Sequence, residues 1–139
     1  MTSGRVVLVT GASGWIGRHI VAAFHSCGDQ VVAHYRSGEA PRGTLSVRGD
    51  LTFDADASSL VDAAAARFGR IDVVVNNAAD QMIGESAGEF GAVDIARWQG
   101  VMDATLLSAV RVTSAALPHM APGSSVVNVS SVEASRAFP

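Results

Sequence analysis

The sequence predicts an α/β fold, a doubly wound parallel sheet with the strand order 3-2-1-4-5 that ends after its fifth strand. Three observations lead to this prediction. Short Val-rich runs recur along the chain, helical patterns separate most of them, and a glycine-rich turn follows the first run. Continuous apolar runs are typical of parallel strands covered on both faces, and right-handed crossovers between such strands produce this order.

Five segments are expected to form the strands. Each combines β-branched residues with a boundary of turn-forming residues, which favours a strand over a buried helix turn. The four strong candidates are "RVVLVT" (5–10), "QVVAHY" (30–35), "IDVVVN" (71–76) and "SVVNVS" (125–130), and the weaker fifth is "TLSVRG" (44–49).

Three segments have apolar residues three or four positions apart, the periodicity of amphipathic helices. A glycine or a proline follows each and is expected to end it. The polar, Gly-rich stretch 80–92 is expected to be a loop. The apolar positions are Ile16, Ile20, Val21 and Phe24 before Gly28; Leu60, Ala64 and Phe68 before Gly69; and Trp98, Met102, Leu106 and Val112, in a helix from 94 to about 117, before Pro118.

Length and composition indicate one domain over residues 1–139. With 48% hydrophobic and 17% charged residues, the chain can bury a core and does not have the composition of a disordered protein. The net charge of −3 and the lack of a basic cluster argue against a nucleic-acid partner. No apolar run reaches the length of a membrane span and the histidines lack metal-ligand spacing, so neither a membrane nor a metal partner is expected. A single cysteine, Cys27, expected to be buried, fits a cytoplasmic protein.

The glycine-rich turn has the spacing of a phosphate-binding loop. Gly11, Gly14 and Gly17 stand between the first strand and the first helix. Gly11 would allow the tight turn, Gly14 would let the backbone approach a pyrophosphate, and Gly17 would let the helix pack close to the sheet. Since a helix N-terminus also attracts phosphates, this context favours a dinucleotide cofactor.

Five stretches in the same order carry a family resemblance: "TGASGWIG" (10–17), "HYRS" (34–37), "GDL" (49–51), "NNAA" (76–79) and "VNVSS" (127–131). On these motifs the chain resembles the N-terminal part of the short-chain dehydrogenase/reductase family, whose cofactor domain is a Rossmann-like fold. Trp15 stands where the family often has glycine. That spacing is more typical of the family's extended branch, which includes epimerases and dehydratases, and it leaves the branch open.

The end of the second predicted strand bears on the choice of cofactor. NAD-binding domains place an acidic residue there, which contacts the ribose hydroxyls and repels a 2′-phosphate. This chain has Tyr35, Arg36 and Ser37 instead. Because a guanidinium and a hydroxyl both bind phosphate, the sequence predicts NADP(H).

The resemblance implies further cofactor contacts. Ser13, Trp15 and Ile16 would line the phosphate loop together with its glycines. Asp50 and Leu51 would hold the adenine ring, although Gly-Asp is also an ordinary turn pair. Contacts at the end of the fourth strand would come from Asn77, Ala78 and Ala79.

The family transfers a hydride between nicotinamide and a carbonyl or alcohol, using Ser, Tyr, Lys and a water-binding Asn. By resemblance Ser131 takes the place of the catalytic serine, and Thr105 stands where the Asn is expected. The Tyr and Lys have no counterpart, since the only tyrosine is Tyr35 and the chain has no lysine. A free tyrosine is a poor base at neutral pH without a nearby cation. We therefore expect the chain alone to be inactive or nearly so, with Glu133 or His119 as remote alternative bases.

Two interpretations follow. The chain is the N-terminal portion of an NADP(H)-dependent short-chain oxidoreductase that acts on a small carbonyl or alcohol substrate, or it is a non-catalytic dinucleotide-binding module or degenerate paralogue that needs a partner chain. An apolar fifth strand at the sheet edge is a pairing hazard, which favours the first interpretation. In the family the long helix builds an oligomer interface, so a homo-oligomer is expected.

Overall fold

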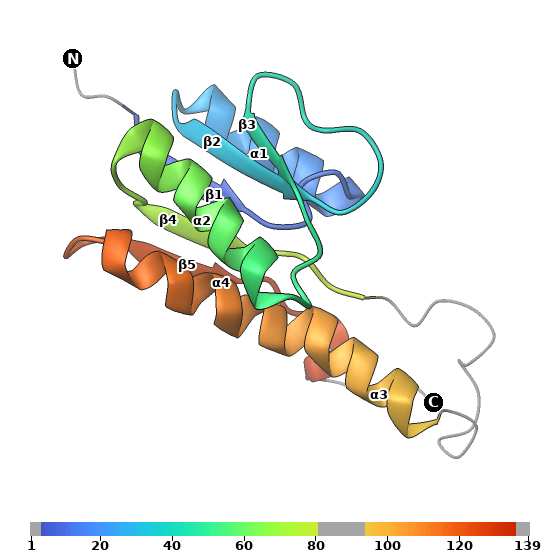
Figure 1. Ribbon diagram of the computed structural model, residues 1–139. Helices are drawn as coiled ribbons and strands as arrows, with labels where there is room; N and C mark the ends of the chain where they lie inside the picture. The colour runs from blue at the N-terminus through green and yellow to red at the C-terminus, as the bar shows by residue number, and fades with distance from the viewer. Residues whose placement is uncertain (1–3, 81–93, 136–139) are drawn as a thin grey trace.

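A computed structural model of the chain describes residues 4–80 and 94–135. Its five parallel strands form one sheet in the order β3-β2-β1-β4-β5, which confirms the predicted fold class (Figure 1). The second strand has the predicted bounds, and the other four are shorter than the runs that predicted them, because the ends of those runs turn into the loops. They are β1 (Val6–Val9), β2 (Gln30–Tyr35), β3 (Leu45–Arg48), β4 (Val73–Asn76) and β5 (Ser125–Asn128).

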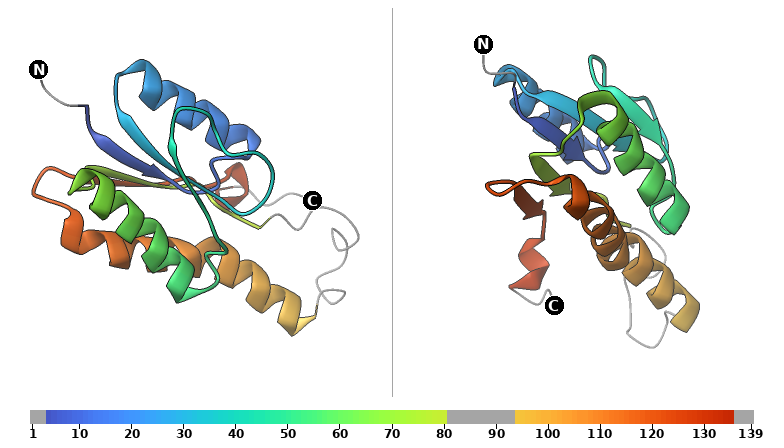
Figure 2. Two further views of the ribbon diagram at one scale, coloured as in Figure 1. Left: turned by 45° about the horizontal axis from the view of Figure 1, so that its top comes forward. Right: turned by 60° about the vertical axis from the view of Figure 1, so that its left-hand side comes forward.

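Helices cover both faces of the sheet. The helix α1 (Trp15–Ser26) lies on one face, and α2 (Asp54–Phe68) and α4 (Ser108–Ala116) lie side by side on the other (Figure 2). The helix α3 (Ile95–Met102) precedes α4 and projects past the sheet. The predicted loop 80–92 lies, apart from Asp80, outside the described residues.

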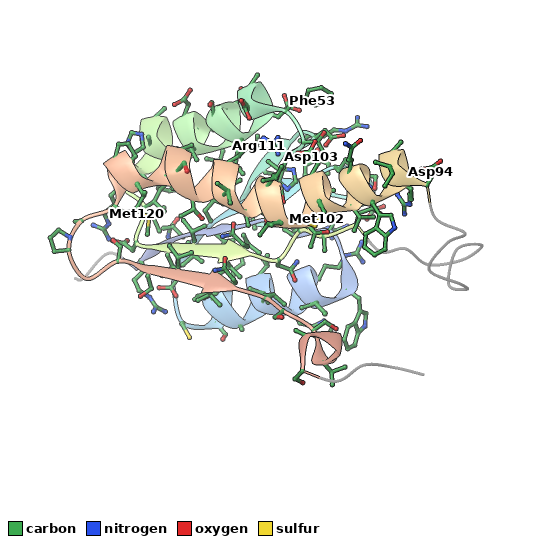
Figure 3. The ribbon with its side chains drawn as sticks, turned by 90° about the horizontal axis from the view of Figure 1, so that it is seen from below. Phe53, Asp94, Met102, Asp103, Arg111 and Met120 are labelled. Carbon is green, nitrogen blue, oxygen red and sulfur yellow. The ribbon has the colours of Figure 1, made fainter. Side chains whose placement is uncertain are left out.

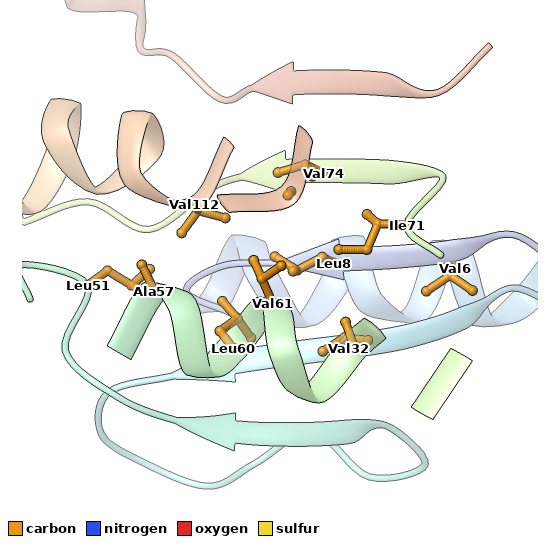
Figure 4. Packing of buried hydrophobic residues seen from close by; sticks show 12 residues of the cluster. Val6, Leu8, Val32, Leu51, Ala57, Leu60, Val61, Ile71, Val74 and Val112 are labelled. Atoms are coloured by element: carbon orange, nitrogen blue, oxygen red, sulfur yellow. The ribbon is translucent and has the colours of Figure 1, made fainter. Parts of the chain in front are cut away.

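Alternation along β1 builds a separate core on each face of the sheet. Val6 and Leu8 pack with the residues of α2 and α4, whereas Val7 and Val9 pack with those of α1. Figure 4 shows the first of these clusters, with Val61 of α2 beside Leu8 of β1. Burial of both strand faces explains why β1 has a continuous apolar run rather than an alternating one.

The first two helices end as their glycines predict. Gly28 follows Cys27, the C-cap of α1, with a φ of 80°, and Gly69 is the C-cap of α2 with a φ of 74°. Both glycines are in the left-handed region, which closes a helix at little steric cost. Burial of Cys27 was predicted wrongly: the residue is exposed, because it is the C-cap of α1, just beyond the last helical residue Ser26.

The predicted long helix is continuous but irregular. A π-helical turn, Asp103–Leu107, joins α3 to α4, and a 3-10 turn, Leu117–His119, follows. By length and composition alone, this 25-residue run, Ile95–His119, is long and apolar enough to cross a membrane. That differs from the sequence expectation, which considered uninterrupted apolar runs, whereas this helix includes polar and charged residues within its length. Length and composition do not separate such a run from a domain helix, and here Val112 and Ala116 pack in the core.

Ion pairs tie this helix to the domain. Nε of Arg111 is 2.6 Å from a carboxylate oxygen of Asp54 in α2, and Nη1 is 2.6 Å from Asp103 in the π turn. The Arg111 and Asp103 side chains lie together in Figure 3. The predicted apolar edge is also present, since Val126 and Val127 of β5 are exposed.

Candidate cofactor-binding site

A pocket of about 560 Å³ opens at the carboxyl ends of β1, β2 and β4. This is the edge at which open α/β sheets bind ligands, beside the point where the strand order reverses. The glycine-rich loop, the ends of β2 and β4, and the segment before α2 all contribute to it. The lining consists of Gly11, Ser13, Gly14, Trp15, Ile16, Gly17, His34, Arg36, Ser37, Asp50, Leu51, Thr52, Asn77, Ala78, Ala79, Asp80 and Ala104.

Two of the glycines are required by close backbone contacts. Gly11 has a φ of 64°, and a Cβ there would lie 2.9 Å from Cα of Ala78. A Cβ on Gly17 would collide with the carbonyl oxygen of Gly11 and lie 2.8 Å from Cα of Ala12. Gly14 is less constrained, since among the described atoms its Cβ would meet only the Gly11 oxygen, at 3.3 Å. The first two roles match the sequence argument, and Gly14 keeps the backbone open toward the pocket.

The N-terminus of α1 faces the pocket. Among the described residues no side chain caps the helix at Gly14. The first-turn residues Trp15, Ile16 and Gly17 belong to the lining, and the Trp15 side chain is 79% exposed. Uncapped N–H groups and the positive end of the helix dipole together favour an anion here.

Thr10 connects β1 to the residues after β4. Its hydroxyl oxygen accepts the backbone N–H groups of Asn77 at 3.0 Å and Ala78 at 2.9 Å. The Asn77 amide in turn donates to the carbonyls of Thr10 and Gly11. Asn77 thus fixes the start of the glycine loop through these hydrogen bonds and also lines the pocket. Thr10 was not among the predicted site residues, although it opens the "TGASGWIG" motif.

The turn after β2 is held on two sides. Oγ of Ser13 donates to the Ser37 carbonyl at 2.8 Å, and Nε of Arg48 donates to the Arg36 carbonyl at 3.2 Å. Arg36 and Ser37 line the pocket with exposed side chains. A cation and a hydroxyl therefore stand at the end of β2, where the sequence argument placed them.

The lining formed by the described residues does not include Tyr35, which was predicted to contact the cofactor; its neighbour His34 lines the pocket instead. Successive strand residues point to opposite faces, so only one of the two can face the glycine loop. His34 was missed because a buried histidine within an apolar run looks like a core residue.

Asp50 both lines the pocket and stabilises a turn. It lines the pocket, and its Oδ1 accepts from the backbone N–H and the hydroxyl of Thr52 at 3.0 and 2.8 Å. Those hydrogen bonds, and to a lesser extent the charge of Arg36, hold the pKa of Asp50 below its ordinary value. The carboxylate is thus ionised at neutral pH and can accept a further hydrogen bond. Leu51 beside it is 5% exposed and belongs to the core.

The two predicted catalytic positions lie outside the pocket lining. The Thr105 hydroxyl, in the π turn, accepts the backbone N–H of Asp80 at 3.2 Å, and the preceding residue Ala104 lines the pocket. Ser131 is exposed and precedes a short 3-10 turn, Val132–Ala134, beyond the end of β5. His119 lies at the opposite edge, where its carbonyl accepts from Ile71 ahead of β4. The geometry separates His119 from the pocket.

Within residues 4–80 and 94–135, no group of three or more His, Cys, Asp and Glu side chains is arranged to hold a metal ion. The pocket's polar groups are backbone N–H groups, an arginine, a histidine, a side-chain amide, hydroxyls and carboxylates. This arrangement defines the class of the protein: a Rossmann-like α/β domain with a glycine-rich loop at the carboxyl edge of its sheet.

Comparison with known proteins agrees with this class. A family model described as enoyl-(acyl carrier protein) reductase matches residues 11–139. An uncharacterized oxidoreductase of Methylorubrum extorquens is 33% identical over 144 residues, covering 93% of this chain and 55% of that protein. The chloroplastic NADPH-dependent aldehyde reductase 1 of Arabidopsis thaliana is 32% identical over 149 residues, covering 94% of this chain and 51% of that protein.

Solved structures agree as well. A blue fluorescent protein from a metagenomic library, in complex with NADPH, superposes with a TM-score of 0.86 at 25% identity, covering 99% of this chain and 60% of that one. The chain belongs to the short-chain dehydrogenase/reductase family of oxidoreductases, of which it represents an N-terminal part. It spans about half the length of the curated relatives it matches.

Proposed function

We propose that this chain binds NADP(H) and forms the cofactor-binding part of an oxidoreductase that transfers a hydride to or from a small carbonyl or alcohol. The observation that carries the proposal is the pair Arg36 and Ser37 in the pocket lining at the end of β2. A cation and a hydroxyl at this point favour a 2′-phosphate, whereas the acidic residue that would repel it is absent from the printed sequence at 35–37.

Two similar proteins support the proposal that the cofactor is NADP(H). One relative is named as NADPH-dependent, and one solved structure is a complex with NADPH. In our proposal the bound cofactor would donate or accept the hydride, and the chain supplies the anion-binding helix end, the Arg36 guanidinium and the Asp50 carboxylate that orient the cofactor. These groups bind and position the cofactor and do not themselves react.

Arg36 offers a direct test. We expect Arg36→Ala to weaken NADP⁺ binding about 10- to 100-fold, the range for losing a hydrogen-bonded charge, and to leave NAD⁺ binding within about twofold. Arg42→Ala is the matched control, since it removes the same charge six residues further along, outside this pocket. Calorimetric titration of each variant with both dinucleotides measures the effect. Equal losses for NADP⁺ and NAD⁺ would refute the assignment.

The catalytic part of the proposal rests on Ser131 and Thr105. The Ser131 hydroxyl would polarise the substrate oxygen, and the Thr105 hydroxyl would hold a water in the proton path. The 139-residue chain has no lysine, and its one tyrosine is Tyr35. We therefore expect little or no carbonyl reduction by this chain alone. NADPH oxidation that Ser131→Ala abolishes would contradict that expectation and require another base.

A second candidate is a non-catalytic dinucleotide-binding module or degenerate paralogue. Thr105, which lacks an amide donor, favours this candidate. The lack of a lysine and of a tyrosine other than Tyr35 in the 139-residue sequence favours it too. The two candidates differ in what accompanies the chain in its source. The intact mass of the native polypeptide separates them: a value well above 14.3 kDa supports the oxidoreductase, and a value of 14.3 kDa supports the module.

We also propose a homo-oligomer in the cytoplasm, without a nucleic-acid or membrane partner. Exposed apolar side chains on α3, on the π turn and on α4, among them Ile95, Leu106 and Val110, are suited to an interface between copies. Light scattering tests the oligomer, and cell fractionation tests the location.

A further inference from the structure

His34 is a buried histidine in contact with the glycine loop. It is 3% exposed, and it lies one residue before the end of β2. Nδ1 accepts the backbone N–H of Gly11 at 3.3 Å, and Nε2 lies 3.0 Å from the carbonyl oxygen of Gly49 after β3. The His34 carbonyl also accepts from Ala12 at 2.8 Å. One residue thus joins β2 and β3 to the loop that lines the pocket.

These partners select one protonation state. Because the Gly11 N–H can only donate, Nδ1 must have a lone pair, and because the Gly49 carbonyl can only accept, Nε2 must carry the proton. The neutral Nε2–H tautomer satisfies both partners. A proton on Nδ1 would set two N–H groups against each other at Gly11, where the backbone makes its left-handed turn.

We propose that neutral His34 positions the glycine loop for dinucleotide binding. Protonation of His34 would break its hydrogen bond with Gly11 and weaken the binding of the cofactor. The inference rests on the proposed function, since it concerns affinity for the same cofactor. His34 acts through the loop and is a positioning residue, because the groups facing the phosphates belong to the loop and the helix end.

The surroundings of His34 determine the pH at which this occurs. Burial is the largest influence and lowers its pKa below the ordinary value. Asp50 before α2 and Asp56 within α2 favour the charged ring, whereas Arg36 at the end of β2 opposes it. Residues 10–13, on the other side, are Thr, Gly, Ala and Ser and carry no charge. Affinity should therefore be complete above the ordinary histidine value of about 6.5 and fall as the solution becomes more acidic than that.

The test is the dissociation constant for NADP⁺ measured by calorimetry from pH 8 to pH 5, in wild type and two variants. His34→Asn keeps an acceptor near the Nδ1 position and does not titrate. His34→Leu removes the acceptor. The 2′-phosphate of NADP⁺ itself titrates near pH 6, so the Asn variant also serves as the baseline for the ligand. Denaturation midpoints at each pH confirm that each protein is folded.

We expect wild type to lose more affinity than His34→Asn as the pH falls from 7.5 to 5. We expect His34→Leu to bind about tenfold more weakly than wild type at pH 7.5, the effect of one hydrogen bond to a buried group. Parallel pH profiles of wild type and His34→Asn, or wild-type affinity in His34→Leu, would overturn the inference and leave the proposed function standing. A folded wild type that binds no dinucleotide at any pH would overturn both.

An amide readout in the free protein adds an independent check. The ¹⁵N–¹H resonance of Gly11 should titrate together with the His34 ring in wild type and should not titrate in His34→Asn. A Gly11 resonance that is insensitive to ring protonation would refute the proposed contact without any cofactor present.

Discussion

Substituting Gly17 with alanine tests how closely α1 must approach the glycine loop. The added Cβ would collide with the Gly11 carbonyl oxygen, and it would lie 2.8 Å from Cα of Ala12 and 2.9 Å from the Gly11 carbonyl carbon. All three are backbone atoms, so no side-chain rotation relieves the contact. The N-terminal turn of α1 has to move away from the loop.

The magnitude follows from two opposing effects. Overpacking of a close-packed site costs about 1–3 kcal/mol. We expect Gly17→Ala to lie at the upper end of this range, because all three contacted atoms belong to the backbone and cannot rotate away. Alanine is favoured over glycine within a helix by about 1 kcal/mol. We therefore expect a net loss of about 1–2 kcal/mol in the free energy of unfolding, together with weaker dinucleotide binding as the helix end moves.

A matched control comes from the same substitution in another helix. Gly100 lies in α3, and no described atom would be within 4 Å of its added Cβ. Gly100→Ala should therefore stabilise by about 0.5–1 kcal/mol. Urea denaturation of both variants should separate them by about 1.5–3 kcal/mol. A Gly17→Ala protein as stable as Gly100→Ala, with unchanged NADP⁺ affinity, would refute the close-packing argument.

Two further predictions concern polar contacts. Thr10→Val should lower the free energy of unfolding by about 1–3 kcal/mol, because the N–H groups of Asn77 and Ala78 lose their acceptor. Thr10→Ser keeps the hydroxyl and should retain most of the wild-type stability. Equal losses for the two variants in urea titrations would contradict this prediction. Asp29→Asn should destabilise by a similar amount at pH 7, because the buried Asp29 carboxylate accepts three hydrogen bonds from Arg5. Those hydrogen bonds lower the pKa of Asp29. The carboxylate therefore stabilises the fold above its ordinary pKa of about 3.9, and this stabilisation is lost as the pH falls below that value. A difference in the free energy of unfolding between wild type and Asp29→Asn that stays constant from pH 7 to pH 3 would count against this prediction.

The fold was predictable because its elements carry strong local signals. The Val-rich strands, the glycines that end α1 and α2, and the strand–turn–helix context of Gly11 and Gly17 all point to one architecture, and the sheet order followed from the right-handed crossover rule. The π turn at Asp103–Leu107 was not predictable, since no Pro or Gly marks it in the sequence.

The site was predictable where a motif coincides with a strand end. Arg36, Ser37 and Asp50 line the pocket because parallel strands end at one edge. His34 and Thr10 were missed for a physical reason: both are buried within or beside apolar strands, and their hydrogen-bond partners lie 15 to 68 residues away in sequence. No local pattern contains such contacts.

The most direct test of the central claim is a two-dimensional ¹⁵N–¹H spectrum of the labelled chain titrated with NADP⁺ and, separately, with NAD⁺. The account predicts saturable shifts at the amides of Ser13, Gly14 and Ser37, which line the pocket, with NADP⁺ binding at least about tenfold more tightly, as expected for a paired 2′-phosphate. Shifts confined to other surfaces, or equal affinity for the two dinucleotides, would contradict the assignment of this pocket to NADP(H).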